Sequence, residues 1–145
     1  MIKTYNIDRE QDTIRLARRI APLIGKGDVL ALYGDLGSGK TFFTRHLCQA
    51  LGVAEPVTSP SFVLVNQYRA PDFQINHIDL FRLQSESDLW GLGIEEFIED
   101  GVTIIEWPQL AERMFDDRTL RLTFDYTPEA RTLTLAVKEA PLCSL

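Results

Sequence analysis

The sequence is poor in the residues that mark disulfide scaffolds and zinc sites. Its 145 residues include only two cysteines and two histidines. Cys48 and Cys143 lie far apart and form no C-x-x-C pair, which argues against a redox motif or a metal knuckle. Because free cysteine usually packs like a small apolar residue, we expect a structural thiol at Cys48 and a tail thiol at Cys143.

Long apolar runs are also missing. No stretch approaches the roughly 18 consecutive apolar residues that a transmembrane helix needs. The first ten residues, MIKTYNIDRE, lack the charged and apolar regions of a signal peptide. We therefore expect a cytoplasmic protein without a membrane span.

Positive charge is sparse and scattered. The chain has 21 Asp and Glu residues against 15 Lys and Arg, for a formal net charge of −6. Neutralising many phosphates requires clustered cations, so we do not expect unaided binding to a long stretch of nucleic acid. A local basic patch, or a partner that holds the nucleic acid, remains open.

The chain does contain enough apolar residues for one core, with 45% hydrophobic residues in a length common for one domain. We predict a single domain over residues 1–145. The first half predicts a helix over residues 8–24 with Asp8 as N-cap, a buried strand over 28–33 and a helix from Lys40 to a stop at Gly52. A strand over 61–68 and one over 73–81 follow as a possible hairpin.

The second half predicts one or two short helical pieces within residues 85–100, then a second fully buried strand, GVTIIEW, at 101–107. Two alternating strands within 118–137 are joined at TPEA. The fold class we predict is α/β, with a P-loop-type mixed sheet flanked by helices and a C-terminal antiparallel edge hairpin.

Residues 34–41, GDLGSGKT, match the P-loop pattern G-x-x-x-x-G-K-[ST] between a buried strand and a helix. Glycines let successive backbone N–H groups approach an anion, and the following helix adds its positive end. Lys40 supplies a charge for the β and γ phosphates, and the Thr41 hydroxyl is placed to bind Mg²⁺. This segment predicts a triphosphate site.

A P-loop site needs another carboxylate near the metal, and two residues qualify. Glu106 ends the second buried strand, and Asp79 ends the strand that contains His77. The alternatives are a solvated strand-end carboxylate at Glu106 and, at Asp79, a helix cap or an ion-pair partner for Arg82. We expect His77 to be packed and hydrogen-bonded rather than catalytic, and from the residues alone Trp107 fits the core.

Four segments together are similar to the TsaE family of small bacterial ATPases required for tRNA threonylcarbamoyladenosine (t6A) biosynthesis. They are GDLGSGKT at 34–41, TSPSF at 58–62, HIDLFR at 77–82 and IIEW at 104–107. Chain length, motif order and a short N-terminal strand and helix extend the resemblance over nearly the whole chain. Departures are Ser38 for the usual Ala, Ser61 for Thr and Phe81 for Tyr.

The resemblance implies roles for individual residues. Lys40, Asp79 and Glu106 would serve hydrolysis, with Thr41, Asp79 and Glu106 serving the metal. Trp107 would lie near the nucleotide rather than in the core, and Thr13 and Arg131 would approach it. The implied nucleotide-contacting set is Thr13, Gly34, Asp35, Leu36, Gly37, Ser38, Gly39, Lys40, Thr41, Phe42, Trp107 and Arg131. The implied switch loop is Thr58, Ser59, Pro60, Ser61 and Phe62.

The function implied is a slow, magnesium-dependent ATPase that acts with TsaB- and TsaD-type proteins, with tRNA held chiefly by those partners. Slow turnover alone is expected because no arginine finger is evident. A small-molecule kinase and a non-hydrolysing nucleotide sensor are the alternatives. GTP is disfavoured because the chain lacks an N-K-x-D motif.

Overall fold

The structure is a computed structural model that describes residues 1–60 and 64–137. Ser61, Phe62 and Cys143 therefore lie outside the described residues. The elements, in chain order, are β1 (Ile2–Asn6), α1 (Glu10–Ile20), the 3₁₀ helix η1 (Ala21–Leu23), β2 (Val29–Tyr33), α2 (Lys40–Ala50), β3 (Val65–Arg69), β4 (Gln74–Asp79), α3 (Glu86–Trp90), α4 (Ile94–Asp100), β5 (Gly101–Glu106), the 3₁₀ helix η2 (Pro108–Met114), β6 (Leu120–Tyr126) and β7 (Arg131–Ala136).

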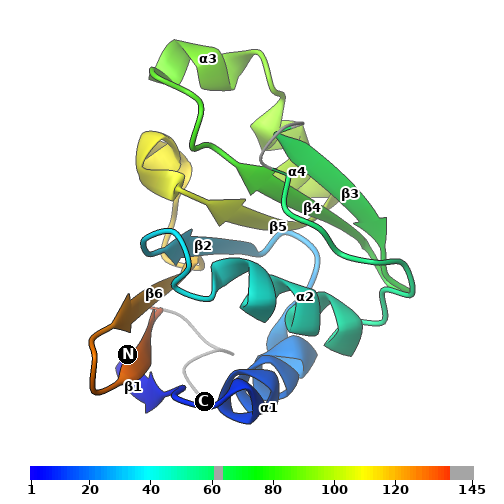
Figure 1. The fold of residues 1–145 in the computed structure, drawn as a ribbon. Helices are drawn as coiled ribbons and strands as arrows, with labels where there is room; N and C mark the ends of the chain where they lie inside the picture. Colours follow the sequence, from blue (N-terminus) through cyan, green and yellow to red (C-terminus); the bar gives the residue numbers. More distant parts are fainter. Residues whose placement is uncertain (61–63, 138–145) are drawn as a thin grey trace.

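A seven-stranded mixed sheet organises the molecule, in the order β1-β7-β6-β2-β5-β4-β3 (Figure 1). The strands β6, β2, β5 and β4 run parallel, whereas the pairs β1/β7, β6/β7 and β3/β4 are antiparallel. The predicted α/β class, the hairpin of β3 and β4, and the C-terminal hairpin are confirmed. Strand β1 adds to the outer side of that hairpin, so the antiparallel end of the sheet contains three strands.

Helices cover both faces of the sheet (Figure 1). Helices α1 and α2 cover one face of the sheet, and the core on that side includes Leu30, Phe43 and Ile104. Helices α3, α4 and η2 cover the other face, where the core includes Ile78, Ile94 and Ile105. Four residues of β2 and all of β5 are buried because helices cover both of their faces. This arrangement explains why their sequences are continuous apolar runs rather than alternating ones.

The boundaries of two predicted elements differ from the structure. The first helix begins after Arg9, whose N–H is capped by Asp12, and it gives way to η1 where Pro22 breaks the α-helical pattern. Asp8 is therefore not the N-cap, because its carboxylate accepts a hydrogen bond from the Arg131 N–H instead, at 2.6 Å. The strand predicted from residue 61 is described only from Val65.

Within the described residues, no helix is both long enough and apolar enough to cross a membrane.

Cys48 is fully buried on α2, and burial raises the pKa of its thiol to about 12. The reactive thiolate is therefore scarce at neutral pH. In a Cys143→Ser variant, which leaves one thiol, we expect a thiol reagent at pH 8 to label the folded protein at least about 100-fold more slowly than the denatured protein. Equal rates, measured by mass spectrometry, would contradict a closed core around α2.

Candidate nucleotide and metal site

The P-loop has the backbone that its sequence predicts. Gly39 is the N-cap of α2 with φ +110°, and Gly34 has φ +148°. A Cβ on Gly34 would lie 2.6 Å from Ser38 Oγ and 2.9 Å from the carbonyl oxygen of Phe124. Both positions favour glycine because of their positive φ, and Gly34 also requires it because β6 approaches so closely.

Lys40 lies at the start of α2 and is only 5% exposed. Its Nζ donates a hydrogen bond to the Gly34 carbonyl oxygen and lies 3.7 Å from the centre of the Trp107 ring. Burial lowers the pKa of Lys40, and the charges of Glu106 and Asp79 oppose that shift. A partly desolvated ammonium held inside a glycine loop is suited to pair with an incoming phosphate.

Asp79 and Glu106 lie side by side because they are register partners at the carboxyl ends of the parallel strands β4 and β5. Both side chains are buried. The Thr41 hydroxyl donates to Glu106 Oε1 at 3.4 Å, which joins the start of α2 to the end of β5. Asp79 Oδ1 accepts a 2.9 Å hydrogen bond from the Phe81 N–H. The sheet thus brings both predicted acids to the P-loop.

His77 also contacts this group of acids, as its position two residues before Asp79 on the same face of β4 allows. Its Nε2 lies 2.6 Å from Glu106 Oε2, and both side chains are buried. An ionised carboxylate only accepts hydrogen bonds, so the imidazole donates. The expectation of a packed, hydrogen-bonded histidine agrees with this contact.

Trp107 is half-buried and has φ +55°, which is rare for a bulky residue and turns the chain sharply after Glu106. Its ring lies 5.0 Å from the Phe81 ring, centre to centre. The indole therefore covers Lys40 at the rim of the site rather than filling the core. This placement is compatible with the position near the nucleotide that the family resemblance implies, which stays a prediction.

A pocket of about 530 Å³ collects most of the predicted residues. From the predicted sets, Thr13, Leu36, Gly37, Ser38, Gly39, Lys40, Thr41, Phe42, Ser59, Asp79, Glu106, Trp107 and Arg131 line it. Gly34, Asp35, Thr58 and Pro60 do not line it. Arg131 reaches the pocket from β7 and donates to the Gly37 carbonyl oxygen at 3.3 Å.

The residues fit a triphosphate and a magnesium ion. Within residues 1–60 and 64–137, the Oγ of Ser38 is buried in the loop without a hydrogen-bond partner, so an anion could accept its proton. No group of three or more His, Cys, Asp or Glu side chains in those residues could hold a metal by itself. The hydroxyl of Thr41 with two carboxylates suits Mg²⁺, which usually keeps waters and phosphate oxygens as its other ligands.

Comparison with known proteins supports the resemblance found in the sequence. A family model described as "Threonylcarbamoyl adenosine biosynthesis protein TsaE" matches residues 7–133. The chain is 31% identical over 143 residues to the Rickettsia felis protein named tRNA threonylcarbamoyladenosine biosynthesis protein TsaE, covering 96% of this chain and 82% of the relative.

The chain belongs to the TsaE family.

Other TsaE relatives and a solved structure agree. The chain is 38% identical to the Aquifex aeolicus TsaE, in a match that covers 75% of this chain and 79% of the relative. It is 34% identical to the Bacillus subtilis TsaE, in a match that covers 77% of this chain and 70% of the relative. The crystal structure of Bacillus subtilis YdiB superposes with a TM-score of 0.79 at 26% identity, covering 96% of this chain and 87% of that chain.

Two departures from the TsaE pattern can now be placed. Phe81, where tyrosine is usual, is 57% exposed and contacts Trp107 through its ring. A ring contact does not require the missing hydroxyl. Ser38, where alanine is usual, contributes the buried unpartnered hydroxyl described above. Ser61 lies outside the described residues.

The described part of the TSPSF segment is tied to the sheet beside the site. The Thr58 N–H donates to the Tyr68 hydroxyl at 3.0 Å, and the Thr58 carbonyl oxygen accepts from Asn66 Nδ2 at 3.1 Å. Ser59 lines the pocket and Pro60 is buried. Its place beside the pocket is compatible with the switch role that the TsaE resemblance implies, which stays a prediction.

Sequence reasoning missed Ile7, Asp8 and Glu10, which also line the pocket. They lie between β1 and the first turn of α1, a few residues before Thr13. Their place depends on the long-range pairing of β1 with β7 and on the bond from Arg131 to Asp8. The sequence did hold one signal for these residues. The resemblance implies that Thr13 approaches the nucleotide, so the residues just before it were also candidates for lining the nucleotide pocket.

Proposed function

We propose that this TsaE-family chain binds ATP with Mg²⁺ and hydrolyses it as a component of the cytoplasmic machinery that makes t6A in tRNA. The observation that carries the proposal is the convergence of buried Lys40, Asp79 and Glu106 on the P-loop. Charged side chains are rarely buried without a structural or catalytic reason. The names of the relatives support t6A synthesis as the process.

The residues have separable tasks in this proposal. Lys40, already partly desolvated, pairs with the β and γ phosphates and stabilises charge that develops in the transition state. Magnesium, held by Thr41 and by one or both carboxylates, would neutralise phosphate charge. Glu106 orients the attacking water or accepts its proton, and His77 holds the carboxylate in place.

His77 is a positioning residue in this scheme because it touches Glu106. We expect His77→Leu to lower kcat for ATP hydrolysis by about 10- to 100-fold, with ATP affinity changed less than about 3-fold. His77→Gln retains an amide donor and should recover most of that loss. Single-turnover hydrolysis and calorimetric binding separate the two quantities. Equal activity of the leucine and glutamine variants would contradict a positioning role. If the activity of both variants fell in proportion to their melting temperature, His77 would have a packing role instead.

Partners are part of the proposal. The TsaE relatives are named for t6A biosynthesis, which supports partners from that process. In this proposal, proteins of the TsaB and TsaD type bind tRNA and transfer the threonylcarbamoyl group. The net charge of −6 agrees with tRNA being held chiefly by those partners. Hydrolysis by this chain alone should be slow, because the residues that line the pocket include one arginine, Arg131, already bonded to the Gly37 carbonyl oxygen.

The proposal is tested by measuring phosphate release from ATP with and without TsaB- and TsaD-type partners, in Mg²⁺ and after its chelation. We expect weak, magnesium-dependent release that the partners increase. Nucleotide binding without release under every condition would favour the sensor, and phosphate transfer to a small acceptor would favour the kinase. GTP in parallel reactions tests the preference for ATP.

A further inference from the structure

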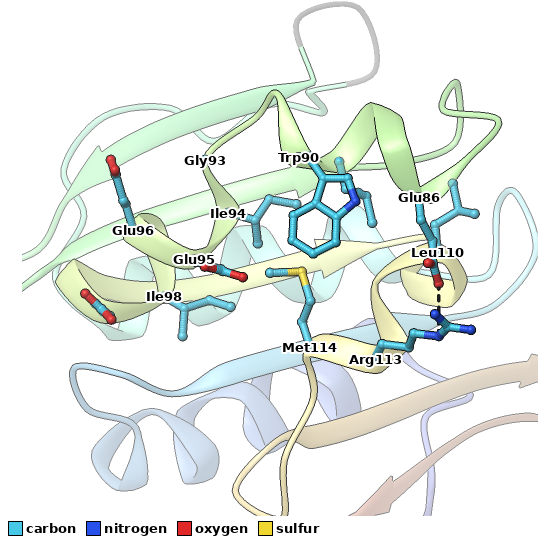
Figure 2. Close-up of a pocket in the computed structure, with 12 residues that line it drawn as sticks. Glu86, Trp90, Gly93, Ile94, Glu95, Glu96, Ile98, Leu110, Arg113 and Met114 are labelled. Atoms are coloured by element: carbon cyan, nitrogen blue, oxygen red, sulfur yellow. Dashed lines mark ion pairs between the residues drawn. The ribbon is translucent and has the colours of Figure 1, made fainter.

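A second hollow, of about 710 Å³, lies between α3, α4 and η2 (Figure 2). It is on the face of the sheet opposite α1 and α2, and within the described part of the chain it shares no residue with the pocket at the P-loop. Its apolar lining consists of Leu89, Trp90, Ile94, Ile98, Leu110 and Met114. We call this hollow, with those residues and its acidic rim, the α3–α4 groove.

Trp90 is the most conspicuous residue of the α3–α4 groove, because its side chain is 72% exposed. Figure 2 shows its indole and the Met114 thioether facing one another across the hollow. An exposed tryptophan leaves a large apolar surface in water, and both tryptophan and methionine are enriched at protein interfaces. Among the described residues, nothing covers this apolar surface between α3 and η2, so it is open to a partner.

The rim of the α3–α4 groove is acidic. Glu86, Glu95, Glu96 and Glu99 line it. Arg113, the one cation among the described residues of the lining, already pairs with Glu86 at 3.4 Å. Residues 83–100 contain six Asp or Glu residues and no Lys or Arg. Such a rim repels the phosphates of RNA and attracts Lys and Arg side chains.

The walls of the α3–α4 groove are continuous with the nucleotide site. Helix η2 starts directly after Trp107, which covers Lys40, and it carries Leu110 and Met114 into the groove. The segment that leads to α3 follows Asp79 and Phe81. A partner bound in the groove would thus contact η2, which follows β5, and α3, which residues 80–85 join to β4.

We propose that the α3–α4 groove docks a basic amphipathic segment of a partner protein. An apolar side chain of that segment packs between Trp90 and Met114, and flanking Lys or Arg side chains pair with the glutamates of the rim. Charge complementarity selects this occupant over nucleic acid. The docking site lies outside the pocket that is proposed to bind nucleotide.

The test uses a fluorescent 15-residue peptide of leucine and lysine in helical amphipathic order, with the full-length protein and no nucleotide. Anisotropy should show saturable binding that weakens with salt. Trp90→Ser and the triple variant Glu95→Gln, Glu96→Gln, Glu99→Gln should each raise the dissociation constant at least about 10-fold. Ile2→Ala, at a residue 76% exposed on the distant β1, and Glu129→Gln are matched controls and should leave it unchanged.

The other outcomes overturn the proposal. Binding that both groove variants leave intact would place the peptide elsewhere. Equal binding of a leucine–glutamate peptide would remove the role of charge, and an RNA oligonucleotide that competes for Trp90 would identify nucleic acid as the occupant. Self-association that Trp90→Ser abolishes, measured by sedimentation, would identify a second copy. Because nucleotide is absent throughout, failure here leaves the ATPase proposal untouched.

Discussion

Lys40→Ala is expected to weaken binding of magnesium-ATP by about 100-fold and to abolish hydrolysis. Charge-assisted hydrogen bonds contribute about 1.5–3 kcal/mol each, and Lys40 would make them to more than one phosphate. Its ammonium is already partly desolvated, so little binding energy is spent in removing water from it. Isothermal titration calorimetry gives the affinity, and phosphate release gives the turnover.

Lys26→Ala is the matched control, because Lys26 is exposed and lies before β2 rather than in the P-loop. It should bind and hydrolyse ATP as the unmodified protein does. Thermal unfolding of Lys26→Ala should stay close to that of the unmodified protein. Lys40→Ala removes the cation that faces the buried carboxylates of Asp79 and Glu106, so thermal unfolding is measured first to show that this variant is folded at the assay temperature. Unchanged affinity in Lys40→Ala would mean that the pocket does not bind phosphate as proposed.

Glu106→Gln is expected to keep ATP affinity within about 3-fold and to lower kcat by about 100- to 10,000-fold, the range typical of losing a general base. The amide still accepts the hydrogen bond from His77 and preserves the volume, so the loss isolates the carboxylate charge. Single-turnover hydrolysis measures it, with Glu129→Gln as an exposed control. Turnover like that of the unmodified protein would remove Glu106 from the chemistry.

The parts of the fold that could be predicted were those with strong local patterns. The apolar runs of β2 and β5 are typical of doubly covered strands, and the glycines and lysine of the P-loop define both a backbone and a charge. Because both strands run parallel and adjacent, Glu106 emerges near Thr41, as expected for the buried strand beside the P-loop.

What could not be predicted depends on long-range pairing. The hydrogen bond from His77 to Glu106 requires the register of β4 on β5, and the place of Asp8 depends on β7. The sequence did not predict η2, because a 3₁₀ segment that begins with a proline has no 3.6-residue apolar period. Without η2, the α3–α4 groove could not be anticipated.

The most direct test of the central claim is synthesis of t6A in a reconstituted mixture of tRNA, ATP, Mg²⁺, a threonylcarbamoyl source and TsaB- and TsaD-type proteins. With this protein added, we expect many t6A molecules per TsaD-type protein. With the protein omitted, or replaced by Lys40→Ala, synthesis should stop after about one turnover. Unchanged multiple-turnover synthesis under either condition would contradict the proposal that this chain is the nucleotide-driven component of t6A formation.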